Sequence, residues 1–347
     1  MAEGSPRILL VRRSSLGDVV VTMPCLVALR RRYPQAHIAW LVEKHLADLV
    51  RGHECLDEVL TVRDYSARRP LQFLWESSRV GRQLAARHFD WAVDLQGRMK
   101  SALLCWGSRA PRRVGFADEF WGLPGWRMIT ETVPCPPGTP AVPRSLLMAR
   151  YLGAEPEPVE FRYPVLPEAQ AWASGFLAER GLSDTPLAAL VLGASVPHKC
   201  WPPEYFAELA SALRRSGRAE PLLIGGRGEQ EREAQVQAAL DRPAASAVGR
   251  TSLPQLAALL ARARVVVSGD TGALHVAVAL GRPVVGLYGP TSPVLTGPYG
   301  PQHRVLWDQP ACGPCNRRPT CSAEDCMRAL TPARVAQAVE ESLAAGA

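Results

Sequence analysis

The sequence lacks any window of about 18 uninterrupted apolar residues, which excludes a membrane-spanning helix. Its first residues hold a short apolar run between arginines and no small-residue cleavage site, which predicts a first strand rather than a signal peptide. We therefore expect a cytoplasmic protein. The 347 residues, 47% of them apolar and 21% charged, are typical of a globular chain long enough for two domains.

Common nucleotide-binding and nucleic-acid motifs are absent as well. The glycine-rich loops match neither G-x-G-x-x-G nor G-x-x-x-x-G-K-[ST], which counts against an ordinary NAD enzyme or ATPase. No helix-turn-helix, zinc-finger spacing or motif of stacking aromatic residues is visible. We therefore expect no nucleic-acid partner.

Lysine is scarce, and the positive charge is uneven. The only lysines are Lys44, Lys100 and Lys199, so nearly all of the 40 cationic residues are arginine. Residues 1–150 hold 22 Lys/Arg against 14 Asp/Glu, whereas residues 151–347 hold 18 against 19. Richness in arginine alone can reflect genomic composition, but the asymmetry between the halves predicts an anionic partner for the first half.

The stretch 263–290 predicts a strand, a glycine-bearing loop, a helix and a second strand. Open parallel sheets bind ligands at the carboxyl ends of their strands, and a helix N-terminus attracts anions. Since the amides of Thr271 and Gly272 open the helix, we expect an anion there. The alternatives are that Asp270 only caps the helix and that His275 is a core histidine.

Strands alternate with helices along the rest of the chain, which predicts parallel, doubly wound α/β sheets. The other predicted strands are Arg7–Arg12, His37–Val42, Glu58–Val62, Trp91–Leu95, Leu187–Leu192 and Pro221–Ile224. The other predicted helices are Val19–Arg32, Leu71–Arg87, one that Gln96–Lys100 opens, Arg144–Leu152, Glu204–Ser216 and one that ends near Leu240.

Two proline-rich stretches, 134–140 and 155–167, separate the halves of the chain. We expect an N-terminal Rossmann-like domain with its linker over 1–165, and a C-terminal one over 166–347 with a cysteine-rich tail and a final helix. The two domains would face each other across a cleft. This is the plan of GT-B glycosyltransferases, although a fold alone does not establish a function.

Further polar residues of the second half follow predicted strands. Lys199 is the only lysine after residue 100 and shares a loop with Ser195, so the two suit a diphosphate; a solvated loop charge is the alternative. Glu229 and Glu231 lie just past a strand, where an acid often binds ribose hydroxyls. A solvated helix surface is equally compatible with both glutamates.

Four segments of the chain resemble the heptosyltransferase family, glycosyltransferase family 9. They are SSLGDVVVTMPCLVALRRRYP, DLQGRMKSALL, the GA-x4-K-x-WP loop and SGDTGALHVAVALGRPVVGLYGPTSP. The resemblance covers nearly the whole chain and implies transfer of heptose from ADP-heptose to the inner core of lipopolysaccharide. The second segment is closest to the subgroup that adds the first heptose, onto Kdo-lipid A.

The resemblance also implies roles for single residues. Asp18 would be the catalytic carboxylate, taking the proton of the acceptor hydroxyl in an inverting displacement, and a helix cap is a compatible second role. The implied donor-binding set is Ser195, Lys199, Asp270, Thr271, Gly272 and His275, and the place of Glu229 just past a strand adds it as the ribose candidate. Because cations and helix dipoles can stabilise the departing ADP, no cofactor is required for catalysis.

Basic residues of the first domain would bind the acceptor at the inner-membrane surface. The candidates are the cations of that domain nearest the predicted loop edge, at the carboxyl ends of its strands: Arg63, Arg68, Arg69, Lys100 and Arg113. Kdo carboxylates and lipid A phosphates are the anions that the charge asymmetry predicts, and a merely solvated surface is the alternative. The enzyme would then act as a peripheral protein at the cytoplasmic face of that membrane.

Two other functions fit the sequence less well. One is transfer from another nucleotide sugar, or to another acceptor, within the same family. The other is non-catalytic binding of a nucleotide sugar or glycolipid, which the presence of both Asp18 and Lys199 disfavours. The oligomeric state stays open.

The cysteines form two groups. Five are isolated and read as small core or loop residues: Cys25, Cys55, Cys105, Cys135 and Cys200. The other four are clustered: Cys312, Cys315, Cys321 and Cys326. In a reducing cytosol this spacing is compatible with a structural zinc site, and free thiols are the alternative.

Overall fold

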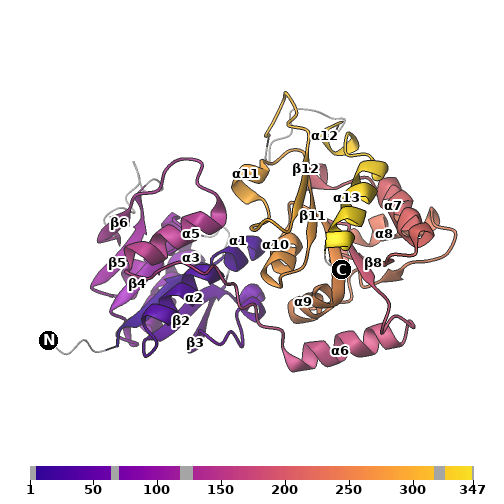
Figure 1. Cartoon of the computed structure of the whole chain (residues 1–347). Helices are drawn as coiled ribbons and strands as arrows, with labels where there is room; N and C mark the ends of the chain where they lie inside the picture. The colour runs from indigo at the N-terminus through magenta and orange to yellow at the C-terminus, as the bar shows by residue number, and fades with distance from the viewer. Residues whose placement is uncertain (1–4, 64–69, 118–127, 316–324, 346–347) are drawn as a thin grey trace. The chain divides into compact units, whose positions relative to one another are not determined.

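The computed structural model describes residues 5–63, 70–117, 128–315 and 325–345. It divides into two compact units, Met1–Pro164 and Val165–Ala347. Figure 1 shows that strands in each unit are flanked by helices, which confirms the predicted α/β class.

The first unit is built on a six-stranded parallel sheet. Its strands are β1 (Arg7–Val11), β2 (His37–Glu43), β3 (Glu58–Val62), β4 (Trp91–Asp94), β5 (Arg112–Phe116) and β6 (Glu131–Val133), in the order β3-β2-β1-β4-β5-β6. One helical layer holds α1 (Leu16–Val21), α2 (Met23–Arg32), α5 (Ala141–Tyr151) and the 3₁₀ helix η1 (Lys44–Leu49). The other holds α3 (Pro70–Ala85) and α4 (Met99–Gly107).

The second unit repeats this design. Its strands are β7 (Leu187–Val191), β8 (Glu220–Ile224), β9 (Ala245–Ser246), β10 (Ala263–Gly269), β11 (Val284–Tyr288) and β12 (Arg304–Trp307), in the order β12-β11-β10-β7-β8-β9. One layer holds α6 (Pro167–Ala178), α9 (Leu253–Arg262) and α10 (Gly272–Ala279). The other holds α7 (Pro203–Ser216), α8 (Gln230–Ala238) and α13 (Pro332–Ala345). The short helices are η4 (Pro197–Lys199), η5 (Arg227–Glu229), α11 (Pro293–Thr296) and α12 (Asp325–Arg328).

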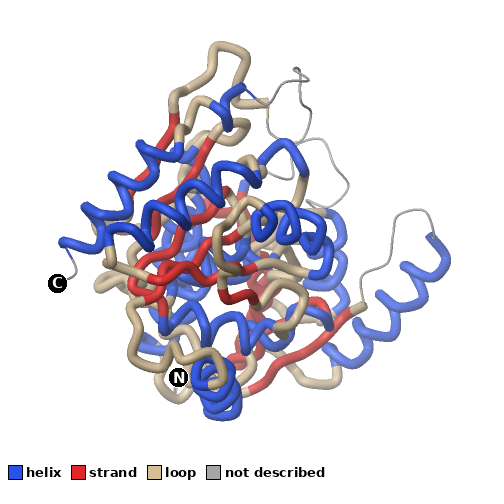
Figure 2. Tube along the Cα trace, turned by 90° about the vertical axis from the view of Figure 1, so that its right-hand side faces the viewer, coloured by secondary structure: helices blue, strands red, loops and turns tan. Residues whose placement is uncertain are grey.

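The central strands are apolar because both of their faces are covered. Every residue of Ile8–Val11 and Val265–Val267 is fully buried. Parallel strands between two helical layers have this continuous apolar character, with no polar face. Figure 2 shows the strands in red running among the blue helices, from another direction. Buried strands fix the sheets, so the loops at their ends are held in defined places.

One predicted helix is divided into two. The expected helix Val19–Arg32 is interrupted at Thr22, which ends α1 and precedes α2. The Thr22 hydroxyl donates to the carbonyl oxygens of Asp18 and Val19, at 3.1 and 2.8 Å. A hydroxyl that bonds back to the preceding turn competes with the helical pattern and bends the chain. As a result α1 is a separate short helix directly after β1.

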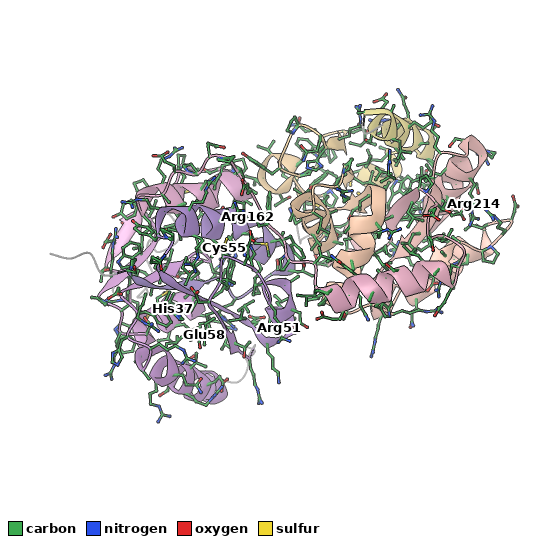
Figure 3. The ribbon with its side chains drawn as sticks, turned by 60° about the horizontal axis from the view of Figure 1, so that its bottom comes forward. His37, Arg51, Cys55, Glu58, Arg162 and Arg214 are labelled. Atoms are coloured by element: carbon green, nitrogen blue, oxygen red, sulfur yellow. The ribbon has the colours of Figure 1, made fainter. Side chains whose placement is uncertain are left out.

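The last segment of the first unit folds back onto that unit. The ring Nε2 of His53 is hydrogen-bonded to the carbonyl oxygen of Phe161 at 3.1 Å, and Arg162 forms an ion pair with Glu54. Figure 3 shows Arg162 beside the buried Cys55. These contacts attach the proline-rich segment, shortly before the unit boundary at Pro164, to the loop between η1 and β3.

None of the helices within the described ranges is both long enough and apolar enough to cross a membrane.

Candidate functional site

The two sheets have the same strand order. In each, the direction in which the chain adds new strands reverses at one place. From β1 the chain proceeds outward through β2 and β3, then returns to add β4 on the other side; β7 and β10 are related in the same way. In doubly wound folds, ligands bind beside the carboxyl ends of the two strands at this switch point. The loops after β1 and β4, and those after β7 and β10, are therefore the candidate sites.

At the first switch point, Asp18 lies in the first turn of α1. Its Oδ2 accepts hydrogen bonds from the amide and the hydroxyl of Ser15, at 3.0 and 2.8 Å. Ser15 is the N-cap, so Asp18 acts from the third helical position rather than as the cap itself. Its side chain is 45% exposed. A held but accessible carboxylate at a helix N-terminus can act on a bound ligand.

Arg12 connects Asp18 to the loop after β4. One guanidinium nitrogen lies 2.7 Å from Oδ1 of Asp18, and another donates to the carbonyl oxygen of Leu95 at 2.5 Å. The next residue, Arg13, forms a buried ion pair with Glu43 at 2.9 Å. Neither Arg12 nor Arg13 was predicted as part of the site. The two contacts of Arg12 fix the position of the Asp18 carboxylate relative to β4.

The loop after β4 is organised around Asp94. This buried carboxylate accepts hydrogen bonds from the amides of Gln96 and Gly97 and from the hydroxyl of Ser101, each at 2.9 Å. Gly97 has a φ of +66°, which a residue with a side chain adopts only at a cost. Burial raises the pKa of Asp94 to about 6, and the three hydrogen bonds oppose that rise. Asp94 therefore shapes the DLQGR loop that was recognised in the sequence.

The predicted acceptor-binding cations are dispersed. Arg63 is exposed at the end of β3, and Lys100 is partly buried in the first turn of α4. Arg68 and Arg69 lie outside the described residues.

The expected place of Arg113 at the carboxyl edge of the sheet is wrong. Arg113 is the second residue of β5, near its amino end. Its guanidinium donates to the carbonyl oxygens of Met128 and Ala110, at 2.6 and 2.7 Å. The error arose because β5, which starts with two arginines, was not predicted as a strand.

At the second switch point, Lys199 and Asp270 form an ion pair. The ammonium nitrogen lies 2.6 Å from Oδ2 of Asp270, and each side chain is 11% exposed. Lys199 comes from the loop after β7, and Asp270 follows β10 directly. A Cβ on Gly269 would lie 3.0 Å from the carbonyl oxygen of Lys199, so this glycine lets the two loops approach closely.

Thr271, rather than Asp270, caps α10. Its hydroxyl accepts the amide of Leu274 at 3.4 Å and is hydrogen-bonded to the hydroxyl of Ser268 at 3.1 Å. The reading of Asp270 as a mere cap is therefore wrong. Gly272 is the first residue of α10, and His275 is buried one turn further on. The positive end of the α10 dipole and the Lys199 ammonium thus lie at one loop edge, an arrangement suited to an anion.

A pocket of about 370 Å³ adjoins the Lys199 loop, and Ser195, Glu229 and Glu231 line it. The Glu229 side chain extends across Gly193, where a Cβ would collide with its carboxyl group. Ser195 is exposed. The structure thus brings both glutamates and Ser195 to one hollow, as a ribose and phosphate site would require.

The structure tests the predictions for the cysteines only in part. All five isolated cysteines are buried. Of the clustered four, Cys312 is exposed and Cys315 and Cys326 are partly buried, whereas Cys321 lies outside the described residues. Within the part of the chain that the structure describes, no three Cys, His, Asp or Glu residues are grouped as a metal site would need. The zinc site therefore stays a prediction.

Comparison with known proteins bears on the whole chain. The family model described as glycosyltransferase family 9 (heptosyltransferase) matches residues 77–326. The chain is 32% identical to lipopolysaccharide heptosyltransferase 1 of Pseudomonas aeruginosa, over 98% of each protein.

Two solved structures are similar to both units. The ADP-heptose lipopolysaccharide heptosyltransferase II of E. coli has a TM-score of 0.79 and 25% identity, over 98% of this chain and 99% of that one. E. coli heptosyltransferase WaaC with ADP has a TM-score of 0.75 and 27% identity, over 97% of this chain and 99% of that one. They confirm the predicted GT-B fold class. Because the family model and the relative both extend across most of the sequence, this chain belongs to glycosyltransferase family 9, the heptosyltransferases.

Proposed function

We propose that this enzyme transfers heptose from ADP-heptose to the inner core of lipopolysaccharide, with inversion at the anomeric carbon. The observation that carries the proposal is that each of the two switch points holds charged groups suited to one part of this reaction. The first holds an accessible carboxylate, Asp18, and the second holds Lys199 beside the N-terminus of α10. A similar solved structure, E. coli heptosyltransferase WaaC, is described with ADP, which supports an adenine nucleotide as the donor's leaving group.

Asp18 is proposed as the general base. As the acceptor oxygen bonds to the anomeric carbon, the bond from that carbon to the diphosphate oxygen breaks, and the hydroxyl proton passes to the Asp18 carboxylate. Ser15 and Arg12 hold the carboxylate without covering it, since 45% of the side chain is exposed. One displacement of this kind inverts the configuration of the sugar.

The second unit is proposed to bind the donor and to stabilise departing ADP. Lys199, the Ser195 hydroxyl and the amides of Thr271 and Gly272 would contact the diphosphate. Their positive charge and dipoles would offset the charge that develops on ADP, which is the task a metal ion performs in other transferases.

Three further side chains are assigned to the rest of the donor. Glu229, which crosses Gly193 in the 370 Å³ pocket, would accept ribose hydroxyls. Asp270 and His275, at the start of α10, would contact the heptose. All three lie at the carboxyl edge of the second sheet, where doubly wound folds bind ligands.

The first unit is proposed to bind the acceptor. Arg63 is exposed at the end of β3, and Arg68 and Arg69 follow in the sequence. With Lys100, they would pair with Kdo carboxylates and lipid A phosphates at the cytoplasmic face of the inner membrane. Similarity of DLQGRMKSALL to first-heptose enzymes favours Kdo-lipid A as the acceptor. We leave Arg113 out of this set because backbone carbonyls hold its guanidinium.

Product analysis tests this function. The purified enzyme is incubated with ADP-heptose and a panel of Kdo-bearing acceptors, with and without EDTA, and mass spectrometry and NMR define the product and its anomeric configuration. We expect one added heptose on a Kdo acceptor, an inverted linkage and no effect of the chelator on transfer. Transfer only from another nucleotide sugar, or retention of configuration, would contradict the proposal.

A further inference from the structure

The pairing of Lys199 with Asp270 changes what the donor site can bind. The ammonium that would hold the diphosphate already lies 2.6 Å from a carboxylate, and both side chains are largely buried. Water screens such a pair less than it screens a surface pair. An incoming diphosphate must therefore share Lys199 with Asp270 and approach a negative charge.

The donor and the product differ in how they meet this carboxylate. In a sugar nucleotide the terminal phosphate is esterified and has one negative charge, and the sugar offers hydroxyl donors. In ADP the terminal phosphate has a second ionisation with a pKa of about 6, so it gains nearly one further negative charge above pH 7. ADP also lacks the hydroxyl groups of the transferred sugar. The Asp270 carboxylate would accept hydrogen bonds from the intact donor but would repel the product.

The rest of the site has the opposite preference. The Lys199 ammonium and the opening amides of α10 favour the more negative ligand, because their interaction with an anion grows with its charge. Without a counteracting group, the site would bind ADP more tightly than the sugar nucleotide and release the product slowly. Among the described residues, the carboxylate that pairs with Lys199 is Asp270.

We propose that Asp270 makes the site selective for the intact sugar nucleotide over ADP, so that its ion pair with Lys199 promotes product release. The inference rests on the proposed function, because it takes Lys199 as a diphosphate ligand. It assigns Asp270 a role in ligand discrimination in addition to contact with the sugar.

Isothermal titration of Asp270→Asn with ADP and with ADP-heptose at pH 7.5 tests the inference. Asparagine keeps the shape of the side chain and removes its charge. We expect ADP to bind about tenfold more tightly, and ADP-heptose to bind no more tightly than it does to the wild type. The dissociation constant for ADP divided by that for ADP-heptose therefore falls about tenfold or more. In steady-state assays, ADP becomes a stronger inhibitor.

Glu208→Gln is the matched control. It removes the same charge from an exposed position on α7 and should leave the ratio unchanged. If Asp270→Asn does not fold, Asp270→Ser is measured in its place. An unchanged ratio in a folded Asp270 variant overturns the inference while leaving the proposed function intact. Failure of the wild type to bind either ligand refutes the proposed function and this inference with it.

Discussion

At the scale of single residues, Asp18 combines a structural and a chemical task. Its carboxylate supports the start of α1 through Ser15 and is also the accessible acid of the first switch point. Asp18→Asn should therefore retain ADP affinity but lose roughly two to four orders of magnitude in turnover, the usual contribution of a general base. Initial rates and calorimetric titration measure the two quantities, with the partly exposed Asp48→Asn as control. Turnover near the wild-type value would remove Asp18 from the mechanism.

Lys199 contributes one flexible ammonium to the proposed diphosphate site. Charge-assisted hydrogen bonds are worth about 1.5–3 kcal/mol, so Lys199→Ala should weaken ADP binding roughly ten- to a hundredfold. The loss includes the effect of leaving the Asp270 carboxylate without its partner at 2.6 Å. Titration calorimetry measures the change, and exposed Arg218→Ala in the same unit is the control. Unchanged affinity would place the diphosphate elsewhere.

At the scale of elements, the connection from β4 to α4 depends on an acid that is buried. Burial raises the pKa of Asp94 from 3.8 to about 6, so the folded state holds its proton more tightly than the unfolded state does. The contribution of Asp94 to the free energy of unfolding of the wild type is therefore fully present below about pH 4, and it is lost as the pH rises to about 6. Since one pKa unit corresponds to about 1.4 kcal/mol, the loss is on the order of 2–3 kcal/mol.

Asp94→Asn should remove that dependence. Its amide oxygen can still accept the amides of Gln96 and Gly97, and its NH₂ group can donate to Ser101, whose hydroxyl also reaches the carbonyl oxygen of Arg98. Relative to the wild type, the variant should gain about 2 kcal/mol in free energy of unfolding between pH 4.5 and pH 7.5. Urea denaturation of both proteins at the two pH values measures this. Equal pH dependence of the two proteins would show that Asp94 titrates normally.

The strands also show how much of the fold could be predicted from the sequence. Apolar runs such as Leu187–Val191 could be placed because they are buried between two helical layers. Strands β5, β6, β9 and β12 were missed, since β5 opens with arginines, β6 has three residues, β9 has two and β12 has four. Their pairing depends on neighbours distant in sequence, which local patterns do not record.

The places of the candidate residues at strand ends could be predicted one by one, but the contacts between them could not. Asp18, Lys199 and Asp270 each follow a strand, and strand ends carry function in such folds. Their partners follow from the strand order, which the sequence does not state. Arg12 and Asp94 were overlooked although both fall inside predicted buried strands. A charge in such a strand needs a partner, and that signal could have found them.

At the scale of the whole molecule, the two halves of the sequence differ in charge, and salt should distinguish their ligands. Residues 1–150 hold 22 Lys/Arg against 14 Asp/Glu, whereas the rest of the chain is nearly balanced. Exposed charges act over about one Debye length, which shrinks from ~10 Å at 0.1 M to ~3 Å at 1 M ionic strength. The donor site instead relies on Lys199, which is only 11% exposed, and on helix amides. Rising salt should therefore increase the KM for the acceptor well before it weakens ADP binding.

Neutralising Arg63, Arg68 and Arg69 together to glutamine locates the effect. The triple variant should lose most of the salt response of the acceptor KM and keep the ADP affinity of the wild type, because its charges lie in the first unit only. A matched variant that neutralises the exposed Arg215, Arg218 and Arg250 of the second unit should keep the full response. Steady-state rates at 50 to 500 mM NaCl give the KM values. If the first variant retains the full salt response, or if acceptor and ADP weaken in parallel as salt rises, these arginines are solvated surface charges and the acceptor binds elsewhere.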